Sequence, residues 1–528
     1  MSTLFIHNVN IISFHEGFIN GMYDSIAING NTIEAVGKYE ALKSLIQPDT
    51  VVIDAKGKTI MPGFNDSHIH IWKVGNLTTF MLDVRGVQSK EELIQLLTDY
   101  HLNNPHLKWI TARGFNEVSW QEKSMPTKVD LDKVCTDKPI YLIRTCAHIA
   151  VCNSKALQIA GIDMHTEAPA GGSIQLGADG IPNGLLNETA LGLVANKIPP
   201  YSIQDLKIMI RACRDEMYRY GITAATDPAA DPLLIKAYKE MDDAGQLGFR
   251  LNILPIILPD GSIEPFPIPE KYNSPFLTIN TVKFFADGGL SGKTSALKRF
   301  YKNSNEQGVL RLDKQQYTAL SRQCMEKGLG VATHAIGDAA IEMVIDVYRE
   351  LNNNFPTNIK RIEHLGLPEK KHLELMHANN IACSMQTIFL DELGKNFIQY
   401  LDDKYLDQCY PVQSVLKHNI LMALSSDAPV VKNFNPLKGI SAAITRKTNE
   451  GKTIAADESI SIEAALKAYT LNAAAIGGEE RFGSLQKGKL ADFIILDKNP
   501  LVTPVKDITD IKVLATYIDG KKVWSLPE

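Results

Sequence analysis

The sequence lacks several features that would assign it to a specialised class of protein. It has no apolar run of about 18 residues, the length that a membrane helix needs, and no long run of charges of one sign around its net charge of -5. Its first residues also lack the basic segment and apolar core of an export signal. We therefore expect a cytoplasmic protein that binds a small molecule, with neither nucleic acid nor a membrane as its partner.

Cysteine and nucleotide-binding glycine motifs are also scarce. The chain has 7 cysteines, an odd number without a C-x-x-C pair, and no G-x-G-x-x-G follows its first strand. A disulfide framework, a cysteine-rich metal site and a dinucleotide site are therefore not expected. We expect reduced and mostly buried cysteines.

The composition is that of a globular protein, and the length of 528 residues is too great for one compact core. The first sixty residues alternate short apolar strands with turns, and the last forty return to the same pattern. Because chain ends often lie close together, we predict one β-sandwich domain formed by residues 1–60 and 480–528.

Residues 61–479 alternate β-type runs with helical patterns, which is typical of a parallel sheet covered by helices. A first strand ends near residues 64–70, and seven more are expected at 222–227, 250–257, 281–288, 329–337, 359–366, 381–388 and 420–427. Eight such units predict an α/β fold, the (β/α)8 barrel of the TIM type. The long interval after the first strand predicts an insertion at about 85–210, above the active site.

Histidine and aspartate side chains occur where predicted strands end. His68 and His70 are two residues apart, so on a strand both would point the same way. His334, His364 and Asp427 end three later strands, and Lys283 lies in the fourth strand. Singly, each histidine is more simply a structural residue, and Lys283 could be a solvated strand lysine. Together they predict a metal site at the mouth of the barrel.

At this point the sequence resembles the amidohydrolase superfamily, specifically its amidohydrolase-3 or YtcJ-like branch of metal-dependent hydrolases. The resemblance covers nearly the whole chain and rests on segments in this order: PGFNDSHIH, VKFFADGGLSGKTSA, THAIGDAAIE, RIEHL, SSDAPV and GSLQKGKLADFIILD. Stretches of the insertion, such as GADGIPNGLLNETA, are similar as well.

The resemblance implies the roles of the site residues. His68, His70 and Asp427 would bind one metal ion, His334 and His364 a second, and Lys283 would bridge them as a carbamate formed with CO2. In relatives with a single ion, His334 joins the first set and His364 assists the water. Imidazole and carboxylate ligands suit zinc, and also iron, manganese or nickel. Barrels of this type often form homodimers, so a homodimer is possible here.

We expect hydrolysis of an amide-like C–N bond other than a peptide bond, in an N-acyl, N-formyl or cyclic amide, by metal-activated hydroxide. Asp427 would act as general base and then as general acid. Trp72, Arg113 and His148 are candidate substrate contacts, although Trp72 and His148 could equally be packing residues.

Three alternatives remain open. A deaminase would use the same scaffold with one metal and release ammonia from a heterocycle. An imidodipeptidase or N-acyl amino acid hydrolase would need a basic group for the substrate carboxylate, such as Arg113 or Arg144. A non-catalytic barrel scaffold is the third reading, and it would not need to keep every ligand position filled.

Overall fold

The computed structural model describes residues 2–117, 120–145, 149–169, 172–188, 190–259 and 264–527. The chain divides into two compact units, one formed by Met1–Ile71 with Arg214–Glu528 and the other by Trp72–Cys213. The candidate histidines, Lys283 and Asp427 all belong to the first unit, whereas Trp72, Arg113 and Arg144 belong to the second.

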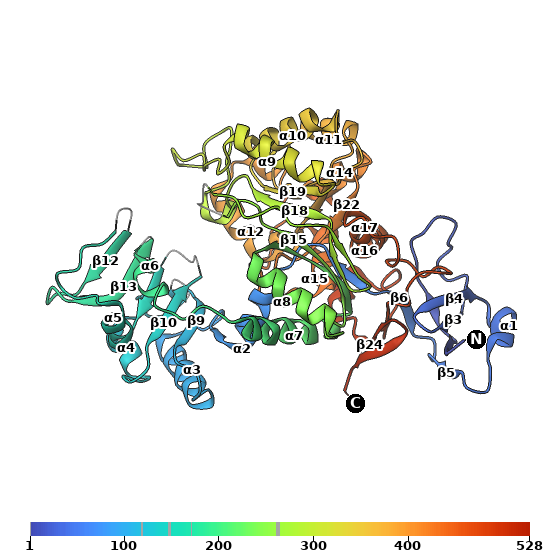
Figure 1. Ribbon diagram of the computed structural model, residues 1–528, viewed down its shortest axis with the longest axis horizontal. Helices are drawn as coiled ribbons and strands as arrows, with labels where there is room; N and C mark the ends of the chain where they lie inside the picture. Colours follow the sequence, from blue (N-terminus) through green and yellow to red (C-terminus); the bar gives the residue numbers. More distant parts are fainter. Residues whose placement is uncertain are drawn as a thin grey trace. The chain divides into compact units, whose positions relative to one another are not determined.

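Two five-stranded sheets carry the expected strands of the first unit (Figure 1). In spatial order, the first contains β16 (Tyr272–Asn273), β17 (Leu277–Ile279), β15 (Arg250–Pro255), β14 (Ile222–Ala230) and β7 (Phe64–Asp66). The second contains β18 (Thr281–Phe285), β19 (Gly330–Ala335), β20 (Lys360–His364), β21 (Ala382–Met385) and β22 (Met422–Leu424). Apart from the antiparallel pair β16 and β17, neighbouring strands are parallel.

The two sheets approach each other at two places. Directly after β15, an isolated parallel bridge joins Ile256 to Lys283. Beside the edge strands β7 and β22, the Ser67 hydroxyl donates to the Leu424 carbonyl at 3.1 Å, and the Asp427 amide donates to the His68 carbonyl at 2.8 Å. Among the described residues, continuous strand pairing does not run from one sheet into the other, so the closed (β/α)8 barrel stays a prediction.

Helices follow most of these strands, as expected of a parallel sheet. Figure 1 shows α9, α10 and α11 beside β18 and β19. The first unit contains the last residues of α7 (Ile203–Arg219), which begins in the second unit. Its other helices are α8 (Pro232–Asp243), α9 (Lys314–Glu326), α10 (Asp338–Asn352), α11 (Lys370–Ala378), α12 (Ile388–Tyr400), α13 (Asp403–Leu406), α14 (Val412–Lys417), α15 (Pro436–Thr445), α16 (Ile462–Ala468) and α17 (Leu471–Ile476). Several begin at side-chain caps: Asp231 accepts from the Leu234 amide at α8, and Asp313 from the Gln316 amide at α9.

The two ends of the chain pair with each other. One sheet contains β4 (Thr32–Gly37), β3 (Ser25–Asn29), β1 (Leu4–His7) and β5 (Val51–Asp54), and the other contains β2 (Asn10–Ile11), β6 (Thr59–Pro62), β23 (Phe493–Leu496), β24 (Val513–Ile518) and β25 (Lys521–Ser525). β6 and β23 are antiparallel neighbours. Leu4, Ile26, Ile60, Phe493 and Tyr517 belong to one buried core. The β-sandwich domain stays a prediction.

The second unit has a six-stranded sheet in the order β12 (Gly172–Leu176), β13 (Pro182–Glu188), β11 (Ile149–Cys152), β10 (Ile140–Arg144), β9 (Ile110–Phe115) and β8 (Met81–Asp83). Alternate residues of β10 enter different cores, because successive strand side chains point to opposite faces. Ile140 and Leu142 pack in one core, and Tyr141 packs in the other. The unit also contains α2 (Ile71–Thr79), which begins at the last residue of the first unit, α3 (Lys90–Asn103), α4 (Lys128–Asp132), α5 (Ser154–Ala160) and α6 (Leu191–Ala195).

No helix in the described ranges combines the length and the apolar character that crossing a bilayer requires.

Candidate metal centre

The structure corrects the prediction that His68 and His70 lie on a strand. β7 ends at Asp66, so both histidines follow it. Backbone hydrogen bonds hold this segment instead: the Ile69 amide donates to the Thr226 carbonyl at 2.9 Å and the His70 amide to the Ala428 carbonyl at 2.9 Å. The two imidazoles therefore owe their orientation to this clamp and not to the pleat of a strand.

Asp66 reinforces the same clamp. Its Oδ1 accepts from the backbone amides of His68 at 3.2 Å and Ser426 at 3.1 Å, which ties the histidine segment to the segment that carries Asp427. The carboxyl is fully buried, and desolvation raises its pKa to about 7. Sequence reasoning did not single out this residue, although it lies two positions before His68.

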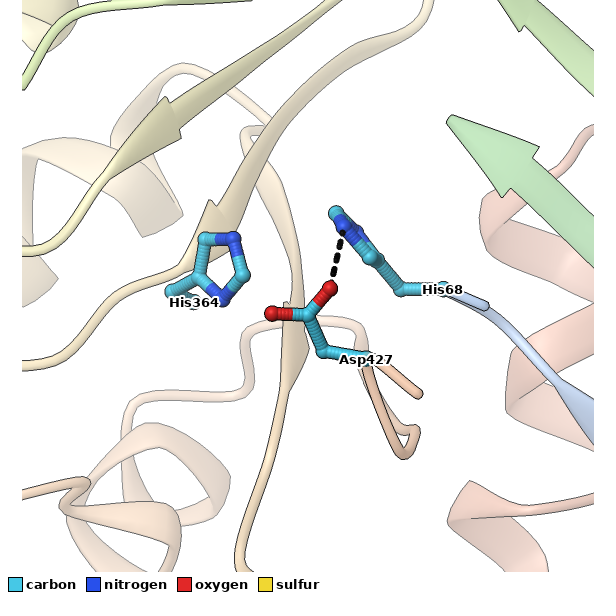
Figure 2. Close-up of side chains that lie close together, drawn as sticks. All are labelled: His68, His364 and Asp427. Atoms are coloured by element: carbon cyan, nitrogen blue, oxygen red, sulfur yellow. Dashed lines mark ion pairs between the residues drawn. The ribbon is translucent and has the colours of Figure 1, made fainter. Parts of the chain in front are cut away.

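The predicted side chains converge in the first unit. Figure 2 shows His68, His364 and Asp427 pointing toward one another, and their ligand atoms all lie within 4.8 Å of each other. Asp427 Oδ1 is 3.5 Å from His68 Nε2 and 3.3 Å from His70 Nε2. The ring of His364 is 4.9 Å from that of His68 and 4.4 Å from that of His334, centroid to centroid. Four imidazoles and one carboxylate thus form a continuous cluster of metal-ligand types.

Lys283 is fully buried, which rules out a solvated strand lysine. No described residue accepts a hydrogen bond from its Nζ, which lies 4.9 Å from the centre of the Phe285 ring. Burial lowers the pKa of this amine to about 8, because desolvation penalises the charged form more than the nearby carboxylates of Glu363 and Asp427 favour it. A buried donor without a partner costs free energy unless another group completes its environment.

Two of the imidazoles are neutral at neutral pH, which is the form that ligates metal ions. Desolvation and the nearby Lys283 lower the pKa of His68 to about 4. Burial and the neighbouring His334 hold the pKa of His364 well below its usual range.

Each of three imidazoles has a hydrogen-bond acceptor that fixes its tautomer. The His68 Nδ1 donates to Glu363, and the His364 Nδ1 donates to Gln386 Oε1 at 2.7 Å. The His334 Nε2 donates to the Gly288 carbonyl at 3.1 Å. The remaining lone pair is therefore Nε2 in His68 and His364, and Nδ1 in His334. Such partners orient metal-ligating histidines.

Asp287 arranges the turn that follows His334. Its carboxylate accepts from the backbone amides of Ala296 at 3.0 Å, Ile336 at 3.0 Å and Gly337 at 2.8 Å. Its Oδ1 also lies 3.4 Å from the His334 Nε2. This one buried carboxylate joins the loop after β18 to the turn between β19 and α10.

The partners Glu363, Gln386 and Asp287 were missed at the sequence level. A signal for Glu363 was present, because Arg361 and Glu363 stand two residues apart in a strand expected to be buried. Buried charges are normally paired or placed at functional sites, so this pattern favoured an internal ion pair.

The backbone is strained at two of the ligand positions. His364 has φ 78° and Asp427 has φ 56°, both in the left-handed region. A residue other than glycine held in such a conformation costs on the order of 1 to 3 kcal/mol, and these outliers cluster at functional sites. Asp427 lies three residues beyond the end of β22, so this turn, and not the strand, directs its carboxylate.

A model of the amidohydrolase family matches residues 51–524. The chain belongs to the amidohydrolase family. The resemblance stated from the motifs is thereby confirmed, and the protein is a hydrolase that acts on carbon–nitrogen bonds.

Several proteins are similar to this amidohydrolase over most of its length. YtcJ of Bacillus subtilis is 29% identical, with 97% of this chain and 99% of YtcJ covered. The N-substituted formamide deformylase of Arthrobacter pascens is 26% identical, with 98% of each chain covered. The crystal structure of an uncharacterized metal-dependent hydrolase from Pyrococcus furiosus has a TM-score of 0.77 at 25% identity and covers 94% of this chain and 99% of its own.

The predicted substrate contacts of this amidohydrolase lie in the second unit. Trp72 is half-buried in α2, with its ring 6.5 Å from that of Tyr201. Arg113 is exposed on β9, and Arg144 pairs with Glu117 at 2.8 Å. His148 lies outside the described residues. The roles of all four in substrate binding stay predictions.

The described cysteines of this amidohydrolase are free thiols, as expected. Cys135 lies within 4.8 Å of ligand atoms of His101 and Asp137 in the second unit. Asp137 is exposed, and burial raises the pKa of the Cys135 thiol, which disfavours the thiolate. We assign no metal to this group.

Proposed function

We propose that this amidohydrolase cleaves the amide-like C–N bond of a small N-formyl, N-acyl or cyclic amide at a divalent-metal centre. The observation that carries the proposal is the convergence of His68, His364 and Asp427, with the ring of His334 next to that of His364 and the buried Lys283 nearby. Relatives named as a formamide deformylase and as a metal-dependent hydrolase support it.

The residues fit a metal centre. The set comprises imidazoles held as single tautomers, the Asp427 carboxylate and an amine without a hydrogen-bond partner among the described residues. The donors would be His68, His70, His334, His364 and Asp427, with zinc as the ion that mixed imidazole and carboxylate sets suit. A bound divalent ion lowers the pKa of water to about 7 and polarises a carbonyl oxygen.

Lys283 completes the site as a carbamate in this proposal. Its neutral amine would attack the carbon of CO2: the N–C bond forms, the π bond to one oxygen breaks with its electrons passing to that oxygen, and the amine loses one proton to water. The carbamate would be an anionic oxygen donor, whose charge would offset that of bound metal ions. Burial of the amine favours this reaction, because the lowered pKa increases the fraction of neutral amine near neutral pH.

Asp427 moves the proton. Its carboxylate lies at the centre of the cluster, where it accepts the proton of the attacking water and then donates it to the departing nitrogen. The strained backbone at φ 56° holds this carboxylate toward His68 and His70. The same carboxylate takes up the proton and delivers it, so Asp427 serves first as general base and then as general acid.

We also propose how the four sheets of the first unit combine. The two five-stranded sheets would form one (β/α)8 barrel, and the two terminal sheets would form its companion β-sandwich. The site then lies where barrel enzymes keep their catalytic groups, because His334 and His364 lie at the carboxyl ends of their strands.

The direct test is hydrolysis by the zinc-loaded protein of N-substituted formamides, N-acyl amines, cyclic amides and N-acyl amino acids. We expect release of formate or of the acid product, loss of activity after chelation, and recovery with zinc. A panel of amino-substituted purines, pyrimidines and triazines, read out as ammonia, detects a deaminase instead. Ammonia from this panel with no amide cleavage would refute the proposal.

Asp427→Asn is the matched variant for the mechanism. We expect its turnover number to fall by about 10²- to 10⁴-fold, which is the usual contribution of general acid–base catalysis. Its circular dichroism spectrum should stay unchanged. Asp346→Asn is the control, because Asp346 is an exposed partner of Lys314 on α10. Substantial turnover by Asp427→Asn would exclude the role given to Asp427.

A further inference from the structure

A chain of buried polar side chains connects two of the site histidines. We call it the buried network. Its members are all fully buried and come from the segment after β7 and from β20, β21, β22 and the residues that follow them: Ser67, Arg361, Glu363, Ser384, Gln386 and Ser425.

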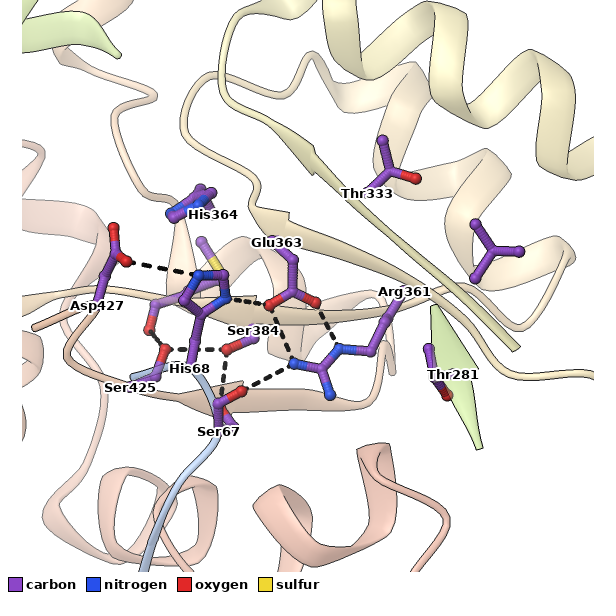
Figure 3. Close-up of polar contacts among 12 residues, drawn as sticks. Ser67, His68, Thr281, Thr333, Arg361, Glu363, His364, Ser384, Ser425 and Asp427 are labelled. Carbon is purple, nitrogen blue, oxygen red and sulfur yellow. Dashed lines mark hydrogen bonds and ion pairs between the residues drawn. The ribbon is translucent and has the colours of Figure 1, made fainter. Parts of the chain in front are cut away.

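One arm of the buried network holds His68. The Glu363 carboxylate accepts from His68 Nδ1 and receives two bonds from Arg361, from Nε at 2.5 Å and from Nη2 at 3.0 Å (Figure 3). The same Nη2 donates to the Ser67 carbonyl at 2.9 Å. The Arg361–Glu363 ion pair thus forms hydrogen bonds both to the ring of His68 and to the peptide group that precedes this residue.

The other arm holds His364. Gln386 Oε1 accepts from His364 Nδ1 at 2.7 Å, and Gln386 Nε2 donates to the Ser425 hydroxyl at 2.8 Å. From Ser425, hydroxyl contacts run to Ser384 at 2.9 Å and on to Ser67 at 2.7 Å (Figure 3). The two arms meet at Ser67, whose carbonyl serves one arm and whose hydroxyl serves the other.

Packing alone does not account for this arrangement. Withdrawing an arginine and a glutamate from water costs free energy, and an apolar pair of the same volume often stabilises a core as well or better. What the buried network provides is orientation of the two imidazole rings. The Nδ1 proton of His68 and that of His364 each have their own acceptor, so the Nε2 lone pair of each ring faces the site.

We propose that the buried network positions His68 and His364 as one coupled unit, so that a change in either arm alters how both rings present their Nε2 atoms. The inference rests on the proposed function, since it assigns to these two rings a shared metal centre. Arg361, Glu363 and Gln386 are then positioning residues.

The experiment measures zinc affinity of the full-length protein by competition with a chromogenic chelator. In the first variant, Arg361→Met with Glu363→Leu, both charges are removed and the volume is nearly kept, so no unpaired charge remains. In the second, Gln386→Met removes the acceptor of His364. We expect each variant to bind zinc about 10- to 100-fold more weakly, the range seen when partners of metal-ligating histidines are lost.

Coupling is tested by combining the changes. Because one continuous chain serves both rings, the triple variant should lose less affinity than the product of the two separate losses. The control for coupling combines Asp287→Asn with Arg361→Met and Glu363→Leu. Asp287 supports His334 through separate contacts, so the loss of zinc affinity in this combination should equal the product of the two separate losses. Multiplicative losses in the triple variant would overturn the coupling.

Thr333→Val is the control for a buried hydroxyl outside the buried network. The Thr333 hydroxyl contacts those of Tyr317 at 2.7 Å and Tyr348 at 2.9 Å, so zinc affinity should stay within twofold of the original value. The visible spectrum of the cobalt-substituted protein should change in the Arg361→Met, Glu363→Leu variant and not in Thr333→Val. An unchanged affinity and spectrum in the first variant would overturn the positioning role.

Failure of this inference is distinct from failure of the proposed function. If the unmodified protein binds no zinc at the site, the metal centre itself is refuted. If it binds zinc and the network variants bind equally well, only the positioning role is lost.

Discussion

At the scale of single residues, two buried strand lysines show how environment selects chemistry. Lys360 starts β20, and its Nζ donates to the carbonyls of Phe355 at 2.9 Å and Asn358 at 3.0 Å. Lys283 is fully buried, yet within the described part of the chain its Nζ has no acceptor. Burial lowers the pKa of both amines, but only the amine of Lys283 is left available for a new bond.

This contrast makes a prediction for carbamate formation. Protein incubated with ¹³C-bicarbonate and zinc should show one carbamate carbon signal by nuclear magnetic resonance. We expect Lys283→Met to lack this signal and Lys360→Met to keep it, since the latter amine is already saturated with hydrogen bonds. A signal that persists in Lys283→Met would contradict the assignment, as would its absence from the unmodified protein.

The ligand candidates could be predicted from the sequence, because His68, His70, His334, His364 and Asp427 stand in order near the ends of apolar runs. Their partners could not. Glu363 and Gln386 act through contacts with residues distant in sequence, and such contacts depend on how β20 and β21 pair. A strand pattern predicts which face a residue is on, but it does not predict the neighbour that the residue meets.

At the scale of elements, strand starts were predicted within about two residues, whereas most strand ends were placed too late; β14 is the exception, since it continues to Ala230, beyond its predicted end at 227. β21 ends at Met385, but its apolar pattern continues to residue 388. The physical reason is that Thr387 is already the N-cap of α12, so the apolar residues that follow belong to a helix. The same limit applies to β7, whose apparent continuation through His70 is a backbone-clamped segment.

A close approach between elements at Gly337 gives a prediction about stability. Gly337 precedes α10, and a Cβ added there would lie 2.0 Å from the carbonyl oxygen of Ala296. We expect Gly337→Ala to destabilise the protein by about 1 to 3 kcal/mol, the usual cost of overpacking. It should also weaken zinc binding, because the displaced turn follows His334.

Gly289→Ala is the matched control for this prediction. Gly289 lies in the loop that contacts the same turn, and a Cβ added there has no described residue within 4 Å apart from its two chain neighbours. Denaturant unfolding and zinc titration of both variants provide the comparison. Equal stability of the two variants would show that the contact at Gly337 can relax without cost.

At the scale of the whole molecule, the chain contains two compact units with separate cores. Sequence length and the long interval after the first strand predicted an insertion, but not its six-stranded sheet. Sheet order in that unit depends on pairings between distant segments.

The division predicts more than one transition on heating. Residues 72–213 have their own cores, so we expect differential scanning calorimetry of the full chain to resolve two unfolding events. Zinc should raise the temperature of the event that belongs to the unit with the site, because a ligand stabilises the state that binds it. The other event should shift little.

A single transition that moves as a whole with zinc would show that the two units unfold cooperatively. Limited proteolysis during the same heating series identifies which event belongs to which unit, since fragments from 72–213 should appear at a temperature that zinc does not change.

The central claim is that six side chains from distant parts of the chain hold a divalent metal ion. Anomalous X-ray diffraction at the zinc edge, on crystals of the zinc-loaded protein, tests it most directly. The claim predicts one or two peaks about 2.0 to 2.3 Å from ligand atoms drawn from His68, His70, Lys283, His334, His364 and Asp427. Zinc-loaded crystals without an anomalous peak among these residues would contradict it.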